Sequence, residues 1–236
     1  MARRGLATLL LLTAAAPGAA QTALPDLSLL DGMTAWVDSV AIADSVHAVP
    51  EQWRGLRVGP SDAPPPADLA DLPDSLCARG REPRLRAPVL AVVAALARAA
   101  ARDGVPIRVR SGYRSTDTQR RLFETRLARG RTFDDIVWSV APPGYSEHML
   151  GTTMDFDLGG RGAEGPVYAW LARNAWKFGL VESYPEATAG VFPWEPWHWR
   201  YHGPIPPAGL TDAGLPRAVL AALGLVPEAA RRHTTP

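Results

Sequence analysis

Apolar residues recur at the three- to four-residue spacing of an amphipathic helix in three stretches of the chain. This pattern predicts helices over residues 88–102, 116–128 and 167–178. Pro88 suits the first turn of the first helix, and the hydroxyl of Ser115 can cap the second. A glycine, the residue that most readily closes a helix, follows each predicted end: Gly104, Gly130 and Gly179.

Alternation of apolar and polar residues, which is typical of a half-buried strand, marks three shorter segments. They are residues 107–110, 153–158 and 197–201. In the last of these, Trp197, Trp199 and Tyr201 share one face, whereas His198 and Arg200 share the other. Helices mixed with short strands, without a regular strand–helix repeat, favour an α+β fold.

The N-terminal end has the pattern of a secretory signal peptide. Arg3 and Arg4 precede an apolar run over residues 6–16, and residues 18–20 offer small side chains for cleavage before Gln21. The run is shorter than the roughly 20 apolar residues that span a bilayer. We therefore expect an exported protein, periplasmic or extracellular, that begins at Gln21. The alternative is a signal segment that is retained as an anchor.

A short helix and a linker are predicted between the signal and the first long helix. Four apolar residues predict the short helix: Trp36, Val37, Val40 and Ile42. The prolines of residues 59–73 predict the linker. The predicted organisation is a signal peptide (1–20), an N-terminal helix with a proline-rich linker (21–83), one folded domain (84–205) and a C-terminal tail with a short helix (206–236).

Composition narrows the chemistry more than the fold. The 236 residues carry a formal charge of +1, from 25 basic and 24 acidic residues, and this balance gives no indication of a nucleic-acid-binding surface. Cys77 is the single cysteine, so an internal disulfide and a cysteine-rich metal cluster are both excluded. Any metal site must therefore use histidine and carboxylate side chains.

Polar residues cluster inside apolar surroundings in residues 111–115, 146–155 and 195–198. His148, Asp155 and His198 would supply nitrogen and oxygen ligands to a catalytic zinc ion and leave a fourth position open. Asp155 and His198 lie on the polar faces of their predicted strands, so both can point into one cleft.

Glu195 and Arg114 have side chains suited to peptide hydrolysis beside such an ion. A carboxylate can accept a proton from water and return it to the leaving amine. A guanidinium can stabilise an oxyanion or grip a substrate carboxylate. The spacing alone does not exclude a structural role for any of these residues. The specific alternatives are Asp157 as ligand in place of Asp155, His202 as a rim residue, and a surface ion pair of Arg114 with Asp117.

Three blocks of the sequence resemble the VanY-type D-alanyl-D-alanine carboxypeptidases, a family of zinc metallopeptidases. The blocks read SGYRSTDTQ, VAPPGYSEHMLGTTMDFD and EPWHWRY. The family pattern S-x-H-x-x-G-x-x-x-D is met by Ser146, His148, Gly151 and Asp155, and the pattern E-x-x-H is met by Glu195 and His198. The blocks occur in the family's order over roughly residues 84–205, which makes the match specific.

The resemblance implies a role for each site residue. His148, Asp155 and His198 would bind Zn²⁺, Glu195 would be the catalytic base, and Arg114 would contact substrate and the developing negative charge. Ser111, Tyr113, Gln119 and Ser146 would contact the substrate. Met149 and Thr153 stand where the family usually has glutamine and alanine. Both residues would border the pocket without being ligands. They therefore affect which substrate is bound more than which reaction is catalysed.

The resemblance also implies a fold and an activity. The expected fold is a small antiparallel sheet with flanking helices, as in hedgehog-like peptidases. The expected activity releases the terminal D-Ala from peptidoglycan stem peptides, with no nucleic acid as partner and no membrane span after signal cleavage. The alternatives are an endopeptidase that cuts another stem-peptide or cross-link bond, and a non-catalytic wall-binding module. The intact Glu195 speaks against the binding module, because a binder needs no base.

Overall fold

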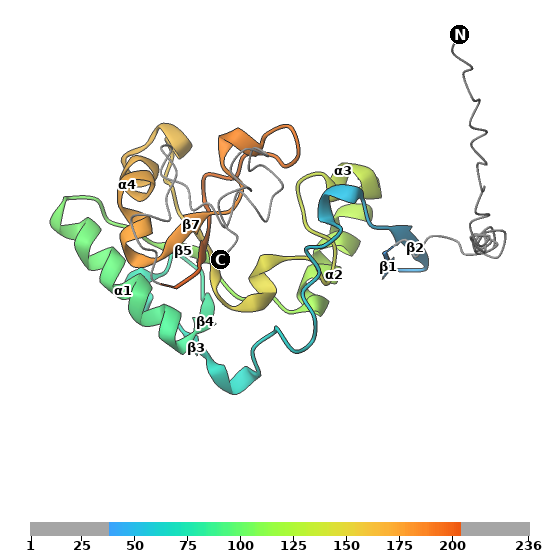
Figure 1. The fold of residues 1–236 in the computed structure, drawn as a ribbon, viewed down its shortest axis with the longest axis horizontal. Coiled ribbons are helices and arrows are strands. Elements are labelled where there is room, and N and C mark those ends of the chain that lie inside the picture. The colour runs from blue at the N-terminus through green and yellow to red at the C-terminus, as the bar shows by residue number, and fades with distance from the viewer. Residues whose placement is uncertain (1–37, 204–236) are drawn as a thin grey trace, which may run out of the picture. The chain divides into compact units, whose positions relative to one another are not determined.

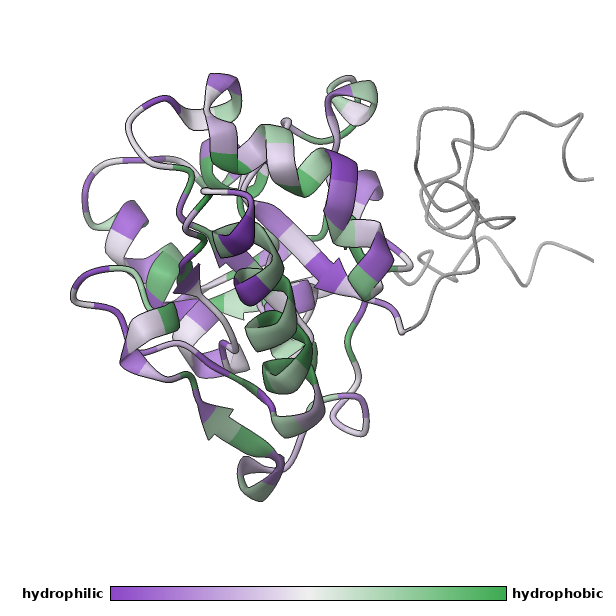
Figure 2. Cartoon of the chain, turned by 90° about the vertical axis from the view of Figure 1, so that its left-hand side faces the viewer, coloured by the Kyte–Doolittle hydropathy of each residue, from purple (hydrophilic) through white to green (hydrophobic). Residues whose placement is uncertain are grey.

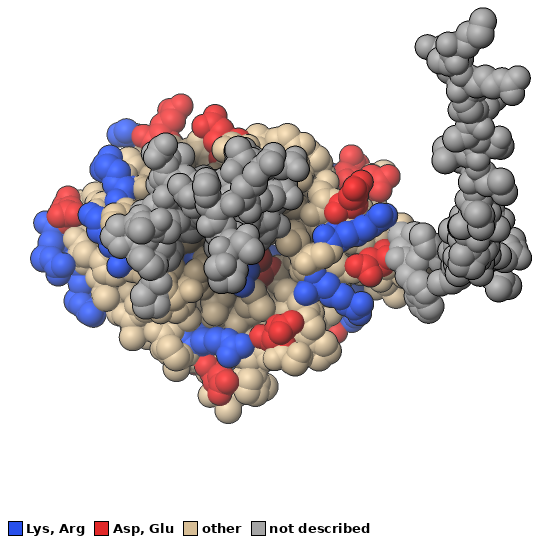
Figure 3. Space-filling model, in the orientation of Figure 1, with Lys and Arg blue, Asp and Glu red and all other residues tan. Residues whose placement is uncertain are grey.

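The computed structural model describes residues 38–203 (Figure 1). The signal-peptide pattern, the predicted tail helix and two residues of the predicted N-terminal helix, Trp36 and Val37, lie outside this range. Every helix within the described range is too short or too polar to cross a bilayer. Basic and acidic side chains are interspersed over the face that Figure 3 shows, in keeping with the small net charge of the chain.

A four-stranded antiparallel sheet carries the residues of the predicted site. Its strands follow the order β5 (Val109–Ser111), β6 (Thr153–Phe156), β8 (His198–Tyr201) and β7 (Leu180–Glu182). On β6, Met154 and Phe156 face one side of the sheet and Asp155 faces the other. Asp155 pairs with Ser111 on β5 and with His198 on β8, so the predicted ligands of two strands are direct neighbours.

Two helices, α1 (Ala87–Arg102) and α4 (Pro166–Asn174), cover one face of this sheet (Figure 1). Their apolar residues form one hydrophobic cluster with Met154, Phe156 and Trp199. Figure 2 views the molecule from the side of α1 and shows this helix mostly in shades of green. Each large apolar side chain that is fully buried contributes about 1.5–3 kcal/mol, which holds the helices against the sheet.

The remaining helices, α2 (Thr116–Leu127) and α3 (Phe133–Val137), lie on the other side of the described region (Figure 1). Ser115 caps α2 by accepting the N–H of Thr118, as its sequence position predicts. A second hydrophobic cluster joins both helices to the N-terminal segment and to the loop after β7. Its members include Val49, Trp53, Phe123, Ile136, Tyr184 and Phe192.

The three predicted helices are confirmed, with α4 continued by a 3₁₀ turn, Ala175–Phe178, that ends at Gly179. The strand predicted over residues 107–110 is shifted to Val109–Ser111. The strand predicted over residues 153–158 is confirmed as β6, but it is not half-buried, because every residue of Thr153–Phe156 is buried and only Asp157 beyond it is exposed. Helices cover one face of β6, and the elements of the site cover the other.

The predicted helix around Val40 and Ile42 is also wrong. The segment forms a hairpin of β1 (Ser39–Ile42) and β2 (Ser45–Ala48), with Ala43 at φ 51° in the turn. Val40 and Ile42 are two residues apart and both buried, which is the spacing of a strand rather than a helix.

The predicted linker is folded in its second half. There, β3 (Leu69–Asp71) pairs with β4 (Arg84–Arg86), and the side chains of Leu69 and Leu72 are buried. Residues 66–73 therefore belong to the folded domain and do not act as a free connection.

Candidate active site

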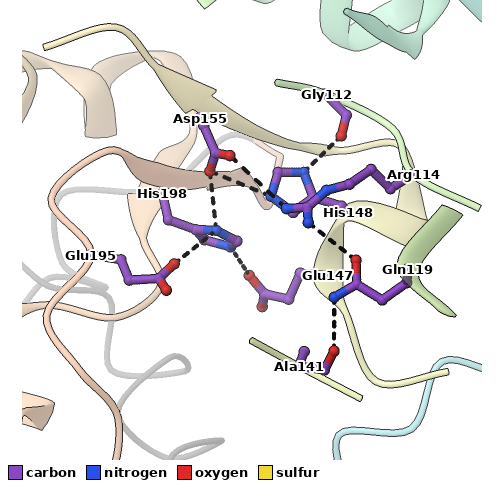
Figure 4. A network of polar contacts seen from close by, with 9 residues as sticks. All are labelled: Gly112, Arg114, Gln119, Ala141, Glu147, His148, Asp155, Glu195 and His198. Carbon is purple, nitrogen blue, oxygen red and sulfur yellow. Dashed lines mark hydrogen bonds and ion pairs between the residues drawn. The ribbon is translucent and has the colours of Figure 1, made fainter. Parts of the chain in front are cut away.

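The three predicted metal ligands converge at the centre of the sheet (Figure 4). Asp155 and His198 are paired across β6 and β8, and His148 lies on the 3₁₀ helix Glu147–Leu150 that precedes β6. One ligand atom from each of the three lies within 4.8 Å of the other two. All three side chains are buried, as a site that excludes bulk water requires.

The geometry of these atoms fits a zinc ion. Asp155 Oδ1 lies 3.4 Å from His148 Nε2 and 3.4 Å from His198 Nδ1. Two atoms bound at about 2.0–2.1 Å to one tetrahedral zinc ion lie roughly 3.3–3.4 Å apart. His148 Nε2 and Asp155 Oδ1 are buried and have no hydrogen-bond partner within the described residues. Buried polar atoms in native proteins are rarely left unpaired, so this pair indicates an ion-binding position.

His148 is oriented by the backbone. Its Nδ1–H donates to the carbonyl oxygen of Gly112 at 2.7 Å, which leaves the lone pair of Nε2 for the ion. Gly112 lies so close to β4 that an added Cβ would clash with the carbonyl oxygen of Arg84. Only glycine fits this position without a shift of the backbone that holds His148.

His198 is oriented by a carboxylate that the sequence analysis missed. Its Nε2–H donates to Glu147 Oε2 at 3.1 Å, and Glu147 Oε1 accepts a hydrogen bond from Arg200 Nη1 at 2.9 Å. Carboxylates of this kind fix the tautomer of a metal-binding histidine and raise its basicity. The only signal in the sequence is that Glu147 adjoins His148, whereas its partners lie 51 and 53 residues away.

The two histidines have opposite pKa shifts. Burial and the positive charge of Arg114 lower the pKa of His148 to about 4, although Asp155 opposes this change. Burial alone would lower the pKa of His198, but the adjacent carboxylates of Asp155 and Glu147 raise it to about 10. Burial would likewise raise the pKa of Asp155, yet the two histidines hold it well below its usual range.

Glu195 lies beside the ligands. Its Oε2 is 3.5 Å from His198 Nδ1, and its backbone N–H donates to the carbonyl of Tyr184 at 3.0 Å. Burial raises the pKa of Glu195 above its ordinary value. A carboxylate with a raised pKa is a stronger base at neutral pH, which suits proton transfer.

Arg114 is held from two sides. Its Nη1 donates to Gln119 Oε1 at 3.1 Å, and its Nη2 lies 3.9 Å from Asp155 Oδ2. Gln119 is itself fixed, because its Nε2 donates to the carbonyl of Ala141 at 2.7 Å. The amide of Gln119 therefore orients the guanidinium, in addition to facing the cavity.

One cavity of about 240 Å³ joins the ligands to four of the other predicted residues. Arg114, Gln119, Ser146 and Glu195 line it, together with Glu147, which was not predicted. Ser111 and Tyr113 are not part of this lining, and their substrate contacts stay a prediction.

None of Asp157, Asp117 and His202, on which the three alternatives depend, lines the cavity of the ligands. Asp157 is exposed and accepts the N–H of Gly159 at 3.0 Å. Asp117 pairs with Arg120 at 2.7 Å. His202 is exposed at a neighbouring cavity.

Comparison with known proteins identifies peptidases as relatives. The family model described as VanY: D-alanyl-D-alanine carboxypeptidase matches residues 82–204, slightly more than half of the chain. A D-alanyl-D-alanine carboxypeptidase of Enterococcus faecalis is 39% identical over 118 residues, which cover 44% of this chain and 43% of that protein. The chain thus matches less than half the length of this relative.

Solved structures give similar results. A VanY D,D-pentapeptidase mutant in complex with Zn(II) is 31% identical, with a TM-score of 0.45 over 56% of this chain and 83% of that one. The LD-carboxypeptidase LdcB is 24% identical, with a TM-score of 0.54 over 69% of this chain and 75% of that one, which shows a shared fold. Because the family model matches more than half of its length, this chain belongs to the VanY D-alanyl-D-alanine carboxypeptidase family.

Proposed function

We propose that this protein is a zinc-dependent D,D-carboxypeptidase that releases the terminal D-Ala from peptidoglycan stem peptides. The observation that carries the proposal is one small cavity that contains the His148, Asp155 and His198 donor set with Glu195 beside it. The E. faecalis relative bears the name of this activity.

His148, Asp155 and His198 would hold the ion through Nε2, Oδ1 and Nδ1. When bound, zinc would act as a Lewis acid and make hydroxide available at neutral pH. Glu195 accepts a proton from the attacking water and delivers it to the amine of the leaving D-Ala. Arg114, held by Gln119, directs its guanidinium at the negative charge that develops on the carbonyl oxygen.

The cavity wall supports cleavage at a chain end. Three arginines line it: Arg110, Arg114 and Arg126. The guanidinium of Arg110 lies 5.7 Å from the ring centroid of Trp197, which holds its charge at the edge of the cavity. A terminal carboxylate complements this wall, whereas the uncharged interior of a longer peptide does not. A volume of about 240 Å³ accommodates a small residue at the end of a chain.

We also propose that the enzyme acts outside the cytoplasmic membrane. The support is the signal-peptide pattern of residues 1–20 and the location of the proposed substrate in the cell wall. Sequencing of the exported protein should give an N-terminus at or near Gln21. Recovery of Met1 or Ala2 from the extracytoplasmic fraction would contradict cleavage.

Incubation of the zinc-loaded protein with a defined stem pentapeptide tests the activity. Mass spectrometry should show loss of one D-Ala and a tetrapeptide product. Cleavage at another bond would identify an endopeptidase, and binding without any product would identify a wall-binding module. Either result would overturn the proposal.

A further inference from the structure

A second, larger cavity lies beside the active site and shares part of its wall. Its volume is about 730 Å³, against about 240 Å³ for the cavity that contains Glu195. Glu147 and Tyr184 line both cavities. Ligand sites are typically about 300–1,000 Å³, so the larger cavity can hold several groups of a bound peptide.

The arginines of this larger cavity differ in how far they are already paired. Arg200 donates to Glu147 at 2.9 Å, and Arg86 donates to the carbonyl oxygens of Leu150 at 2.9 Å and Asp62 at 3.0 Å. Arg57 is exposed and makes no hydrogen bond or ion pair within residues 38–203. Its charge is therefore available to a ligand.

The carboxylates of the cavity do not neutralise Arg57. Glu147 is paired with His198 at 3.1 Å and with Arg200. Asp62 accepts the backbone N–H of Gly59 at 2.8 Å. A ligand that complements the remaining charge is an anion, and a planar carboxylate matches the fork of a guanidinium.

The loop that presents Arg57 is fixed to the domain. The N–H of Val58 donates to the carbonyl of Gly144 at 2.7 Å, and Arg86 holds the other end of the loop at Asp62. Residues 55–62 precede the family match at residues 82–204. This wall therefore lies outside the residues that the family model matches.

The cavity lies along the direction of β8 from the ligand His198. His198 and Arg200 point to the same side of β8, and both contact Glu147. Two residues of a strand span about 6.6 Å, which is also about two residues of an extended substrate. A peptide with its terminal residue in the small cavity can thus place a group from two or three residues before the cut in the larger cavity, which Arg200 and Arg57 line.

We propose that the larger cavity binds the acyl part of the substrate peptide and that Arg57 recognises a carboxylate on it. The inference rests on the proposed function for the direction of the peptide. In a pentapeptide that ends in D-Ala-D-Ala, this carboxylate has two possible sources, the α-carboxylate of a γ-linked glutamate at the second residue and a side-chain carboxylate at the third.

Binding can be measured without turnover on the zinc-loaded Glu195→Gln protein. Calorimetry would compare a pentapeptide with both carboxylates free to two versions in which one carboxylate is an amide. We expect one amide to raise Kd about tenfold, as for loss of a charge-assisted hydrogen bond. The residue that carries this amide identifies the source.

Arg57→Gln, added to this protein, should raise Kd for the free peptide about tenfold and remove the difference between the peptides. Arg79→Gln, an exposed arginine outside both cavities, is the matched control and should change nothing. Equal Kd values for all three peptides, or an equal loss of affinity for all three on Arg57→Gln, would overturn the inference. Carboxylate-dependent binding without turnover by the wild-type protein would overturn the proposed function alone.

Discussion

The two halves of the candidate metal site hold their histidines by different means. His148 is fixed by the carbonyl of Gly112, with the cationic Arg114 nearby. His198 is fixed by the carboxylate of Glu147, which Arg200 holds in turn. The first half therefore depends on backbone position, and the second depends on a chain of charged side chains.

The difference separates two properties that a hydrolytic site needs. The His148 half keeps its imidazole neutral, with a pKa lowered to about 4 by burial and by Arg114. The His198 half concentrates negative charge, since Glu147, Asp155 and Glu195 all lie within 3.5 Å of its imidazole. Charge stabilisation thus belongs to one half and proton transfer to the other. Substitutions should divide in the same way.

Loss of either histidine should have the largest effect. We expect about one zinc ion per wild-type chain, and loss of the ion in His148→Ala and in His198→Ala, because two ligands do not hold zinc. Elemental analysis after dialysis measures the content. Full occupancy in the double variant would contradict the assignment of both halves.

Glu195→Gln should reduce kcat by roughly 10²–10⁴-fold, the usual contribution of general acid–base catalysis. Zinc content and stability should stay near wild type, because glutamine keeps the shape and polarity of the side chain. Asp157→Asn is the matched control, since this exposed carboxylate lies outside the cavity. Normal turnover of Glu195→Gln at saturating zinc would assign the base elsewhere.

Arg114→Lys tests the charge-stabilising half. The loss of a donor aimed at an oxyanion typically costs about 10²–10³-fold in kcat, and lysine keeps the charge without the fork. Zinc content should not change. Arg120→Lys, at the exposed pair with Asp117, should behave as wild type. Wild-type kinetics of Arg114→Lys would remove this residue from the site.

Glu147→Gln should weaken zinc binding by about 10–100-fold, as is typical for a partner that orients a ligand histidine. Competition with a chromophoric chelator gives the affinity, and the exposed Glu164→Gln serves as control.

Gly112→Ala should instead destabilise the fold, because its Cβ meets the carbonyl of Arg84. Equal loss of stability in both variants would erase the contrast between the halves.

A further effect, on stability and not on the site, is expected outside both halves, at Glu182 on β7. Its carboxylate accepts hydrogen bonds from Tyr168 and Trp194, at 3.2 and 2.8 Å. Burial raises its pKa from 4.5 to about 7, helped by Glu186, while those two bonds and the charge of His198 oppose the shift. The folded state thus binds this proton more tightly than the unfolded state.

The proton on Glu182 therefore adds to the free energy of unfolding. This contribution is fully present below pH 4.5 and is lost as pH rises through 7. A shift of this size corresponds to about 3 kcal/mol. Urea unfolding of the wild type at pH 5 and pH 8 should show this loss, and Glu182→Gln should flatten it. An identical pH dependence in both proteins would exclude Glu182 as its cause.

The sequence predicts those parts of the molecule whose causes are local. Helix α2 is an example, since Ser115 and the apolar residues that follow it lie within one short segment. That Asp155 and His198 point to one side of the sheet was also predictable, because alternation along each strand gives the face. Glu147 was not, because its function depends on Arg200, 53 residues away.

The errors in the N-terminal segment have the same origin. Val40 and Ile42 are too few residues to distinguish a strand from a helix, and the choice is made by their packing against α2 and α3. The proline-rich residues predicted a linker, yet Leu69 is buried because β4 offers it a partner. Partners distant in sequence decide both cases.

Trp53 extends this dependence to the order of folding. Its indole N–H donates to the carbonyl of Val137 at 2.8 Å, across 84 residues, and its ring lines the cavity of Glu195. A contact over such a separation closes a long loop, so it forms after contacts between neighbours. We therefore expect the wall of the active site that Trp53 forms to be completed late in folding, after the local contacts of the helices.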